Sequence, residues 1–218
     1  MNKQSILQQT EQYVRKELSG ESSGHDWWHI HRVRNLALSI AREEETDLFI
    51  VEMAALLHDI GDPKLYDDDT TIAPKLIGSK LDELGVVDPE RKSIIYIIGN
   101  MSFSKSLEGK EVDKSKEFMV VQDADRLDAI GAVGIARTFA FGGNKNRLIY
   151  DPNILPNSNL TPDQYRKAEG HTINHFYEKL FLLKDRMNTD TAKKMAGERH
   201  KFMESFLEQF YGEWDGKL

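Results

Sequence analysis

The stretch LFIVEMAALLHDIGD, residues 48–62, decides the fold. The part before the histidine is apolar on nearly every side of a helical wheel, so this helix is expected to lie at the centre of the protein. Asp47 precedes it and is a typical N-cap residue, and Gly61 and Pro63 are expected to end it. His58 and Asp59 close this helix, and both side chains therefore start from a buried position.

Helical periodicity recurs along the rest of the chain, and no strand-like alternation is found. We therefore predict an all-α protein with a single domain over residues 1–218. Helices are expected at 2–18, 26–44, 72–84, 89–100, 115–130 and 131–141, and two long helices within 162–214. The core is expected at about 20–141, with the C-terminal helices 162–214 packing on it. A loop rich in Gly, Pro and Asn, residues 142–161, is expected to be mobile or to act as a lid.

The composition excludes several classes of protein. The chain has 218 residues, 39% hydrophobic and 30% charged, as in ordinary soluble proteins. A net charge of −7 argues against a nucleic-acid-binding surface. The chain has no cysteine, so disulfides and thiolate metal sites are excluded. No apolar run has the ~18 residues that a membrane span needs. We expect a cytoplasmic protein that binds neither nucleic acid nor membrane.

Helical wheels show which polar groups face the interior. Around His29, the residues Val33, Leu36 and Ile40 fall within roughly 40°, whereas His31 lies on the opposite side. Around Asp125, a similar apolar stripe is found, and Asp123 points away. A carboxylate in such a stripe is costly unless it is paired.

Two imidazoles and two carboxylates are thus directed inward, from His29, His58, Asp59 and Asp125. This mixed set suits a divalent ion such as Mn²⁺, Fe²⁺, Co²⁺ or Ni²⁺ better than a closed zinc site. A histidine on an apolar face is also a common hydrogen-bonded core residue, and an inward aspartate can pair with Arg32 or Arg126. Both interpretations stay open at this point.

Three motifs carry a resemblance to a known family. H-x-x-R-V at 29–33, LLHDIGD at 56–62 and DADRLDAIGAVGIAR at 123–137 resemble the HD-domain metal-dependent phosphohydrolase superfamily. The C-terminal sequence from His175 is similar to its small stand-alone bacterial YpgQ/YedJ-like branch. The resemblance implies an HD-type helical bundle. The metal ligands it implies are His29, His58, Asp59 and Asp125.

The resemblance also implies an activity, which is the hydrolysis of phosphate esters and anhydrides. The branch implies a nucleoside or deoxynucleoside triphosphate pyrophosphohydrolase, in which a metal-activated water attacks and pyrophosphate is released. Two alternatives are a nucleoside 5′-monophosphate phosphomonoesterase and a non-catalytic module that senses a nucleotide. Mn²⁺ is the expected metal, with Mg²⁺, Co²⁺, Ni²⁺ and Fe²⁺ as other candidates. The partner is a small-molecule nucleotide, and a homodimer is compatible with the sequence.

Further residues are candidates for catalysis and substrate binding. Asp62 lies one turn beyond His58 and is placed to orient or deprotonate a water, and Asp128 is placed to orient a ligand or a water. Lys64 is a candidate for both catalysis and phosphate binding, and Arg32 and His25 for substrate binding. The alternatives are a solvated turn for Asp62 and Lys64, an ion pair for Arg32 and loop capping for His25.

Other polar and aromatic residues have packing roles as their simpler explanation. His171 and His175 have the i, i+4 spacing of a metal-binding pair, but the expected role is packing or a wall of the pocket. The loop residues Lys145, Arg147 and Tyr150 are candidates for closing over a nucleotide, or form mobile surface. Trp27 and Trp28 either stack on a base or anchor their helix to the core.

Overall fold

The computed structural model describes residues 2–20, 26–61, 72–101, 112–157 and 170–218. All regular elements within these ranges are helices, so the predicted all-α class is confirmed. Contacts between Cα atoms group the chain into two compact units, Met1–Ala124 and Asp125–Leu218. The finer expectation, a core at about 20–141 on which helices from 162–214 pack, stays a prediction. No helix in the described ranges is long and apolar enough to cross a bilayer.

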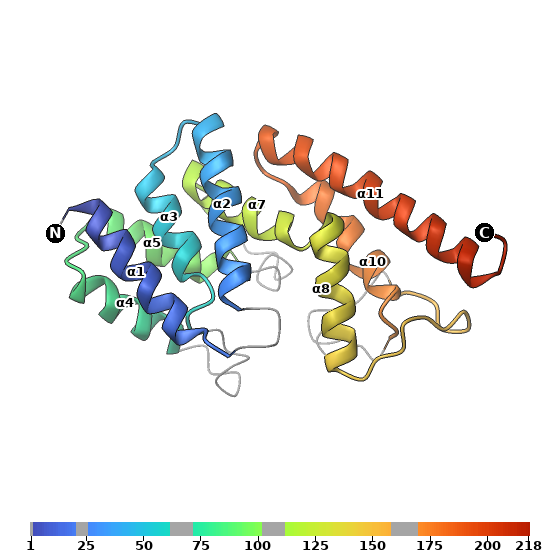
Figure 1. Ribbon diagram of the computed structural model, residues 1–218. Coiled ribbons are helices and arrows are strands. Elements are labelled where there is room, and N and C mark those ends of the chain that lie inside the picture. Colours follow the sequence, from blue (N-terminus) through green and yellow to red (C-terminus); the bar gives the residue numbers. More distant parts are fainter. Residues whose placement is uncertain (1, 21–25, 62–71, 102–111, 158–169) are drawn as a thin grey trace. The chain divides into compact units, whose positions relative to one another are not determined.

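The first unit is built around one apolar helix. Its described helices are α1 (Lys3–Glu17), α2 (Trp27–Glu43), α3 (Leu48–Leu57), α4 (Ile72–Glu83), α5 (Glu90–Asn100) and most of α7 (Lys116–Asp128) (Figure 1). The helix α3 contacts α1, α2 and α5, which confirms its predicted central position. Its buried residues are Phe49, Val51, Met53, Ala54, Ala55, Leu56 and Leu57. Each large apolar side chain buried in this way contributes about 1.5–3 kcal/mol to stability.

Aspartates begin two of these helices, as the sequence predicts. The side chain of Asp47 accepts hydrogen bonds from the backbone N–H of Phe49, at 2.8 Å, and of Ile50, at 3.1 Å. Asp26 caps α2 in the same manner. Each cap satisfies backbone donors that a helix leaves unpaired in its first turn. Because the caps fix where α2 and α3 start, they also fix which residues of each helix face inward.

The end of α3 differs slightly from the prediction. The helix stops at Leu57 with His58 as its C-cap, and a turn leads to Gly61. Gly61 has φ +74°, in the left-handed region that favours glycine. A Cβ atom built at this position would lie 2.7 Å from the Cα of Ala73, in the first turn of α4. Glycine is therefore required both by the turn and by the close approach of α4.

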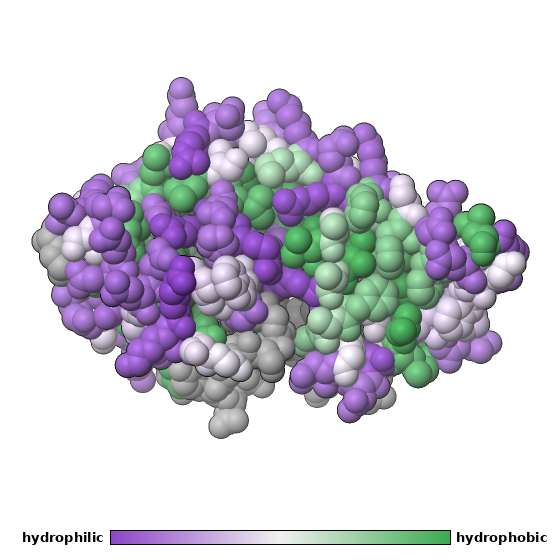
Figure 2. Space-filling view, viewed as in Figure 1, coloured by the Kyte–Doolittle hydropathy of each residue, from purple (hydrophilic) through white to green (hydrophobic). Residues whose placement is uncertain are grey.

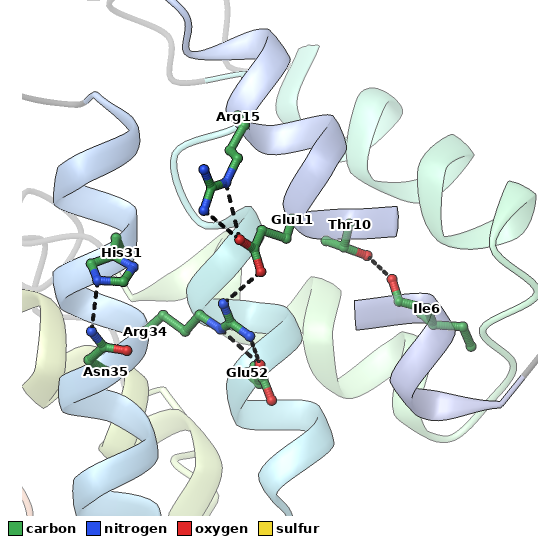
Figure 3. A network of polar contacts seen from close by, with 8 residues as sticks. All are labelled: Ile6, Thr10, Glu11, Arg15, His31, Arg34, Asn35 and Glu52. Atoms are coloured by element: carbon green, nitrogen blue, oxygen red, sulfur yellow. Dashed lines mark hydrogen bonds and ion pairs between the residues drawn. The ribbon is translucent and has the colours of Figure 1, made fainter. Parts of the chain in front are cut away.

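One arginine joins three helices of the first unit. Arg34 of α2 donates to Glu11 of α1, at 2.9 Å, and through its Nε to Glu52 of α3, at 2.8 Å (Figure 3). Partial burial alone would raise the pKa of Glu11, but hydrogen bonds and charge from Arg15 and Arg34 hold that pKa below its usual value. The network fixes the outer surfaces of α1 and α2 relative to the central helix.

The second unit contains α8 (Gly131–Asn144), α10 (Asn174–Glu178), the 3₁₀ helix η2 (Leu180–Arg186) and α11 (Asp190–Trp214). The prediction of two long helices within 162–214 is wrong, because in the described part of this range only α11 is long. The helix α10 has five residues, and η2 follows after Lys179. Aromatic packing explains this irregular path, since Phe176 stacks on Phe206 with ring centroids 5.9 Å apart.

The predicted loop 142–161 is partly helical. The helix α8 continues to Asn144, and residues 145–157 form turns and irregular chain. Figure 2 shows apolar side chains on the surface over α8. Val133 and Phe141 of this helix are 39% and 41% exposed. The helix α8 also contacts α11.

Candidate metal centre

His29 faces the interior of the first unit. The side-chain oxygen of Asp26 accepts a hydrogen bond from the backbone N–H of His29 at 2.9 Å, so the cap of α2 also sets the position of this residue. His29 is 1% exposed, which confirms the orientation predicted from the helical wheel. His31 is half-buried on another face of α2 and its Nε2 lies 3.1 Å from the Asn35 side-chain amide.

The His58 ring is held in one orientation by its own helix. Its Nδ1 lies 2.9 Å from the backbone oxygen of Ala55. Because a carbonyl oxygen only accepts hydrogen bonds, Nδ1 carries the proton, and in the neutral ring Nε2 keeps a lone pair. This is the arrangement that metal-binding histidines usually adopt.

The two histidines and the following aspartate converge. The Nε2 atoms of His29 and His58 are 3.2 Å apart. The carboxylate of Asp59 lies 3.4 Å from each of these nitrogens, one oxygen to each ring. The side chains of His29, His58 and Asp59 are 1%, 4% and 11% exposed. Three ligand-type groups from α2 and the end of α3 therefore share one shielded point.

Asp125 completes the set and lies directly after Ala124 in the unbroken helix α7. One ligand atom each from His29, His58 and Asp125 lie within 4.8 Å of one another, a spacing that can hold a metal ion. The predicted orientation of Asp123 is wrong, since this residue is 0% exposed. The helix is buried on nearly all faces in its second half, so apolar periodicity does not distinguish one inward side there.

The chemistry of these side chains fits a divalent ion. Two nitrogens about 2.1 Å from one ion are about 3 Å apart when they occupy neighbouring positions, close to the separation of the two Nε2 atoms. Imidazole together with carboxylate is typical of sites for Mn²⁺, Fe²⁺, Co²⁺ and Ni²⁺. A buried carboxylate beside two imidazoles is costly without a cation. The group is thus suited to bind a metal.

Three predicted site residues, His25, Asp62 and Lys64, lie outside the described residues, and so does Pro63. Arg32 lies on α2 three residues after His29 and is half-buried. The predicted roles of these residues stay predictions.

Asp128 is held by an arginine that the sequence interpretation did not assign. It is the last residue of α7, is 1% exposed, and accepts a hydrogen bond from Nη1 of Arg137 at 2.6 Å. Arg137 also lies in the motif at 123–137, so its spacing from Asp128 was available in the sequence. The pair means that the carboxylate of Asp128 has a structural partner within the second unit, alongside its predicted catalytic role.

The histidine pair of the C-terminal segment does not lie on one helix. His171 precedes α10, and both of its ring nitrogens make hydrogen bonds. Nε2 lies 3.0 Å from the Ile154 carbonyl oxygen, and Nδ1 accepts from the Asn174 backbone N–H at 3.2 Å. Burial lowers the pKa of His175 to about 3, with further lowering by the charges of Lys179 and Arg147. Because both of its ring nitrogens are hydrogen-bonded, His171 is part of the packing of this segment, as the simpler explanation expects.

The aromatic candidates divide between core and surface. Trp27 is buried with Arg15 stacked over its ring at 4.2 Å, so it anchors α2, whereas Trp28 is 60% exposed. Tyr150 packs edge-on against His171 and Trp214, at 5.1 and 5.0 Å between ring centroids. In this structure Tyr150 is part of the packing of the second unit.

Comparison with known proteins identifies the family. The model of the HD domain matches residues 27–130, which include His29, the doublet His58-Asp59 and Asp125. YpgQ of Bacillus subtilis is 44% identical over 206 residues, covering 93% of this chain and 92% of that protein. The chain belongs to the HD domain family.

Solved structures of family members support this assignment. A crystal structure of an HD-superfamily hydrolase from Bacillus thuringiensis is 45% identical, with a TM-score of 0.77 and coverage of 98% and 99% of the two chains. The crystal structure of YpgQ in complex with ADP is 40% identical, with a TM-score of 0.74 and coverage of 95% and 97%. This HD-domain protein is accordingly a metal-dependent phosphohydrolase by family.

Proposed function

We propose that this HD-domain protein is a nucleotide pyrophosphohydrolase that cleaves nucleoside or deoxynucleoside triphosphates into the monophosphate and pyrophosphate. The observation that carries the proposal is the convergence of His29, His58 and Asp125 within 4.8 Å of one another in a shielded place. The ADP bound by the relative YpgQ supports a nucleotide as the ligand. A phosphomonoesterase acting on nucleoside monophosphates would use the same metal group.

Four residues of the chain would hold the ion: His29, His58, Asp59 and Asp125. A divalent ion bound by them supplies a water of lowered pKa and neutralises phosphate charge. The hydrogen bond from His58 Nδ1 to the Ala55 carbonyl oxygen keeps Nε2 directed at the ion. Asp62, which follows the doublet, is proposed to orient the attacking water and accept its proton. Lys64, Arg32 and His25 are proposed to contact the substrate.

Product analysis tests the proposal. The protein is incubated with Mn²⁺ and each of the common ribo- and deoxyribonucleoside triphosphates and monophosphates. Equimolar pyrophosphate and monophosphate from a triphosphate is the expected result. Orthophosphate released from monophosphates, with triphosphates left intact, would instead identify a phosphomonoesterase.

Metal removal tests the cofactor. We expect EDTA to abolish turnover, and among Mn²⁺, Mg²⁺, Co²⁺, Ni²⁺ and Fe²⁺ we expect Mn²⁺ to restore it best. Turnover that survives exhaustive chelation and dialysis would refute a metal-dependent mechanism.

An Asp62→Asn variant separates an enzyme from a nucleotide sensor. The enzyme is expected to lose about 10²- to 10⁴-fold in turnover while it keeps its metal, since the variant removes only a proton acceptor. A sensor would bind nucleotide equally well with either residue and would release no product in either form.

A further inference from the structure

A pocket of the second unit lies on one face of α11. Its cavity of about 470 Å³ falls in the range of natural small-molecule sites, about 300–1,000 Å³. The walls come from α10, η2 and α11 (Figure 1). Every lining residue belongs to the second unit, so the pocket is a feature of that unit alone. The aromatic and polar residues that line it are Tyr177, Phe181, His200, Glu204, Glu208 and Tyr211.

Three aromatic rings of this pocket are held by one another and by His200. The Phe181 ring packs edge-on against Tyr177 and His200, at 5.5 and 4.8 Å between ring centroids. The hydroxyl oxygens of Tyr177 and Tyr211 are 3.2 Å apart. Burial, together with this hydrogen bond, raises the pKa of Tyr211, so its hydroxyl keeps its proton at neutral pH. The rings therefore offer the pocket π faces and neutral hydroxyl groups.

Two carboxylates give the pocket a negative charge. Glu204 and Glu208 are exposed and lie one helical turn apart on α11, and the described lining includes no lysine or arginine. Glu204 lies 3.4 Å from Nε2 of His200, whose side chain is 15% exposed. No group among the described residues forms a hydrogen bond or an ion pair with Glu208. Such a pocket repels phosphate groups and attracts cations.

His200 adds a second polar atom that lacks a partner. Its Nδ1 is buried and makes no hydrogen bond within the described part of the chain. Because Nε2 lies beside a carboxylate, the proton of the neutral ring is favoured on Nε2, which leaves Nδ1 as an acceptor. A buried polar atom without a partner is costly and rare in native proteins, and such costs are typical of functional sites. The pocket thus combines acceptors that lack donors with a negative charge.

The geometry favours an organic cation over a metal ion. In the described ranges, ligand atoms within 4.8 Å of one another are found at His29, His58 and Asp125, and not in this pocket. Aromatic rings contribute nothing to a metal ion, whereas their faces attract ammonium groups. Carboxylates accept strong hydrogen bonds from the N–H groups of the same cations.

We propose that this pocket binds a small free aliphatic amine of the diamine or polyamine class. The methylene groups of the amine lie against the rings of Tyr177, Phe181 and Tyr211, and its ammonium groups donate to Glu204 and Glu208. The site gives the HD-domain protein a ligand that is separate from its nucleotide, and it does not depend on the proposed function.

Calorimetry with simple amines tests the proposal. 1,4-Diaminobutane and spermidine are titrated into the full-length protein in excess Mn²⁺, which also fills any carboxylate site for divalent ions. We expect saturable binding of both amines that the excess of Mn²⁺ does not abolish. The comparison ligand is 1,4-butanediol, which has the same carbon chain and no charge. It is expected to bind at least about tenfold more weakly, because it cannot form charge-assisted hydrogen bonds.

Paired variants of α11 separate the pocket from general attraction. The double variant Glu204→Gln/Glu208→Gln is expected to weaken diamine binding about tenfold. Glu198→Gln/Glu213→Gln removes the same charge from exposed positions of the same helix outside the pocket and should change the affinity less than about twofold. Phe181→Leu keeps apolar bulk, removes the π face and should weaken binding about two- to fivefold. Melting temperatures of the glutamine variants are expected to match the wild type, since the four side chains are exposed.

Equal losses in the two double variants would overturn the proposal, because binding would then reflect only the net charge of −7. Equal affinity for 1,4-butanediol and 1,4-diaminobutane would do the same, and so would loss of amine binding in excess Mn²⁺. Sedimentation distinguishes a small amine from a second copy of the chain. A dimer that Glu204→Gln/Glu208→Gln dissociates and that amines leave intact would make the pocket a contact between copies, and the proposal would fail.

Discussion

The two units of the molecule hold their polar groups in different ways. In the first unit, the shielded groups His29, His58 and Asp59 offer lone pairs and a negative charge. In the second unit, the buried carboxylate of Asp128 is paired with the half-buried guanidinium of Arg137. The first set is suited to a metal cation, with Asp125 of the second unit as a further candidate ligand. The second set is a neutralised pair, which is suited to holding the fold together.

The cost of burying these groups also differs between the units. A neutral imidazole is much cheaper to shield from water than an ammonium or a guanidinium. The two imidazoles of the first unit are therefore cheap to shield, whereas the Asp59 carboxylate beside them is costly without a cation. In the second unit, Arg137 is balanced by the carboxylate of Asp128. We expect substitutions of the candidate ligands, Asp125 included, to act mainly on metal binding and substitution of Arg137 to act mainly on stability.

The largest effect is expected for substitutions of the candidate metal ligands. His58→Ala should abolish bound metal and lower turnover by at least about 10³-fold, because two or three ligands hold a divalent ion poorly. Asp125→Ala should act in the same way. Elemental analysis of the purified variants measures the metal. His31→Ala, on the other face of α2, is the matched control and should keep wild-type metal. Full occupancy in His58→Ala would contradict the ligand assignment.

The next effect is expected in the second unit, at the ion pair of Arg137 and Asp128. Arg137→Met should lower the free energy of unfolding by about 2–4 kcal/mol, because a carboxylate that is 2% exposed loses a cationic partner. Urea denaturation measures the change. Arg91→Met removes the partner of the exposed Asp82 carboxylate in the first unit and should cost much less. Equal losses in both variants would mean that burial does not set the strength of these pairs.

A smaller effect is expected from acid, at His175. Burial lowers its pKa to about 3, whereas an unfolded histidine has a pKa of about 6.5. The unfolded state therefore binds a proton first as the pH falls, and stability present above pH 6.5 is lost between about 6.5 and 3. Between pH 7 and pH 5 this residue should contribute a loss of about 1–2 kcal/mol. Urea denaturation of His175→Gln should show a flatter pH dependence than the wild type.

The smallest effect is expected at the cap of α2. Asp26→Ala should cost about 1 kcal/mol of stability, because the N–H of His29 loses its acceptor. Asp26→Asn keeps a capping side chain and should keep both stability and metal. Loss of metal in Asp26→Asn would show that this aspartate is itself a ligand, and that the doublet His25-Asp26 resembles His58-Asp59 in function as well as in sequence.

The parts of the fold that local signals determine could be predicted from the sequence. Asp26 and Asp47 are helix caps, so the starts of α2 and α3 were accessible, and the inward direction of His29 followed from them. The helix α7 shows the limit of this reasoning. Asp123 is fully buried although the wheel directs it outward, because the second half of α7 is buried on nearly every face.

The C-terminal part was harder to predict for a different reason. The helical path is interrupted at Lys179, between α10 and η2. Ring packing around Phe176, rather than helical propensity, determines the path of the chain there. The candidate ligand residues could be named in advance because residue type and helical spacing indicate them, and their assignment as ligands stays a prediction.

The bond between the His58 ring and the Ala55 carbonyl oxygen has a consequence for the arrival of the ion. The imidazole of His58 already has the required tautomer and orientation before it coordinates an ion. Folding has already removed part of the conformational entropy of this side chain, so binding of the ion costs less entropy. The last turn of α3 is thus prepared for the cation by one of its own backbone carbonyl groups.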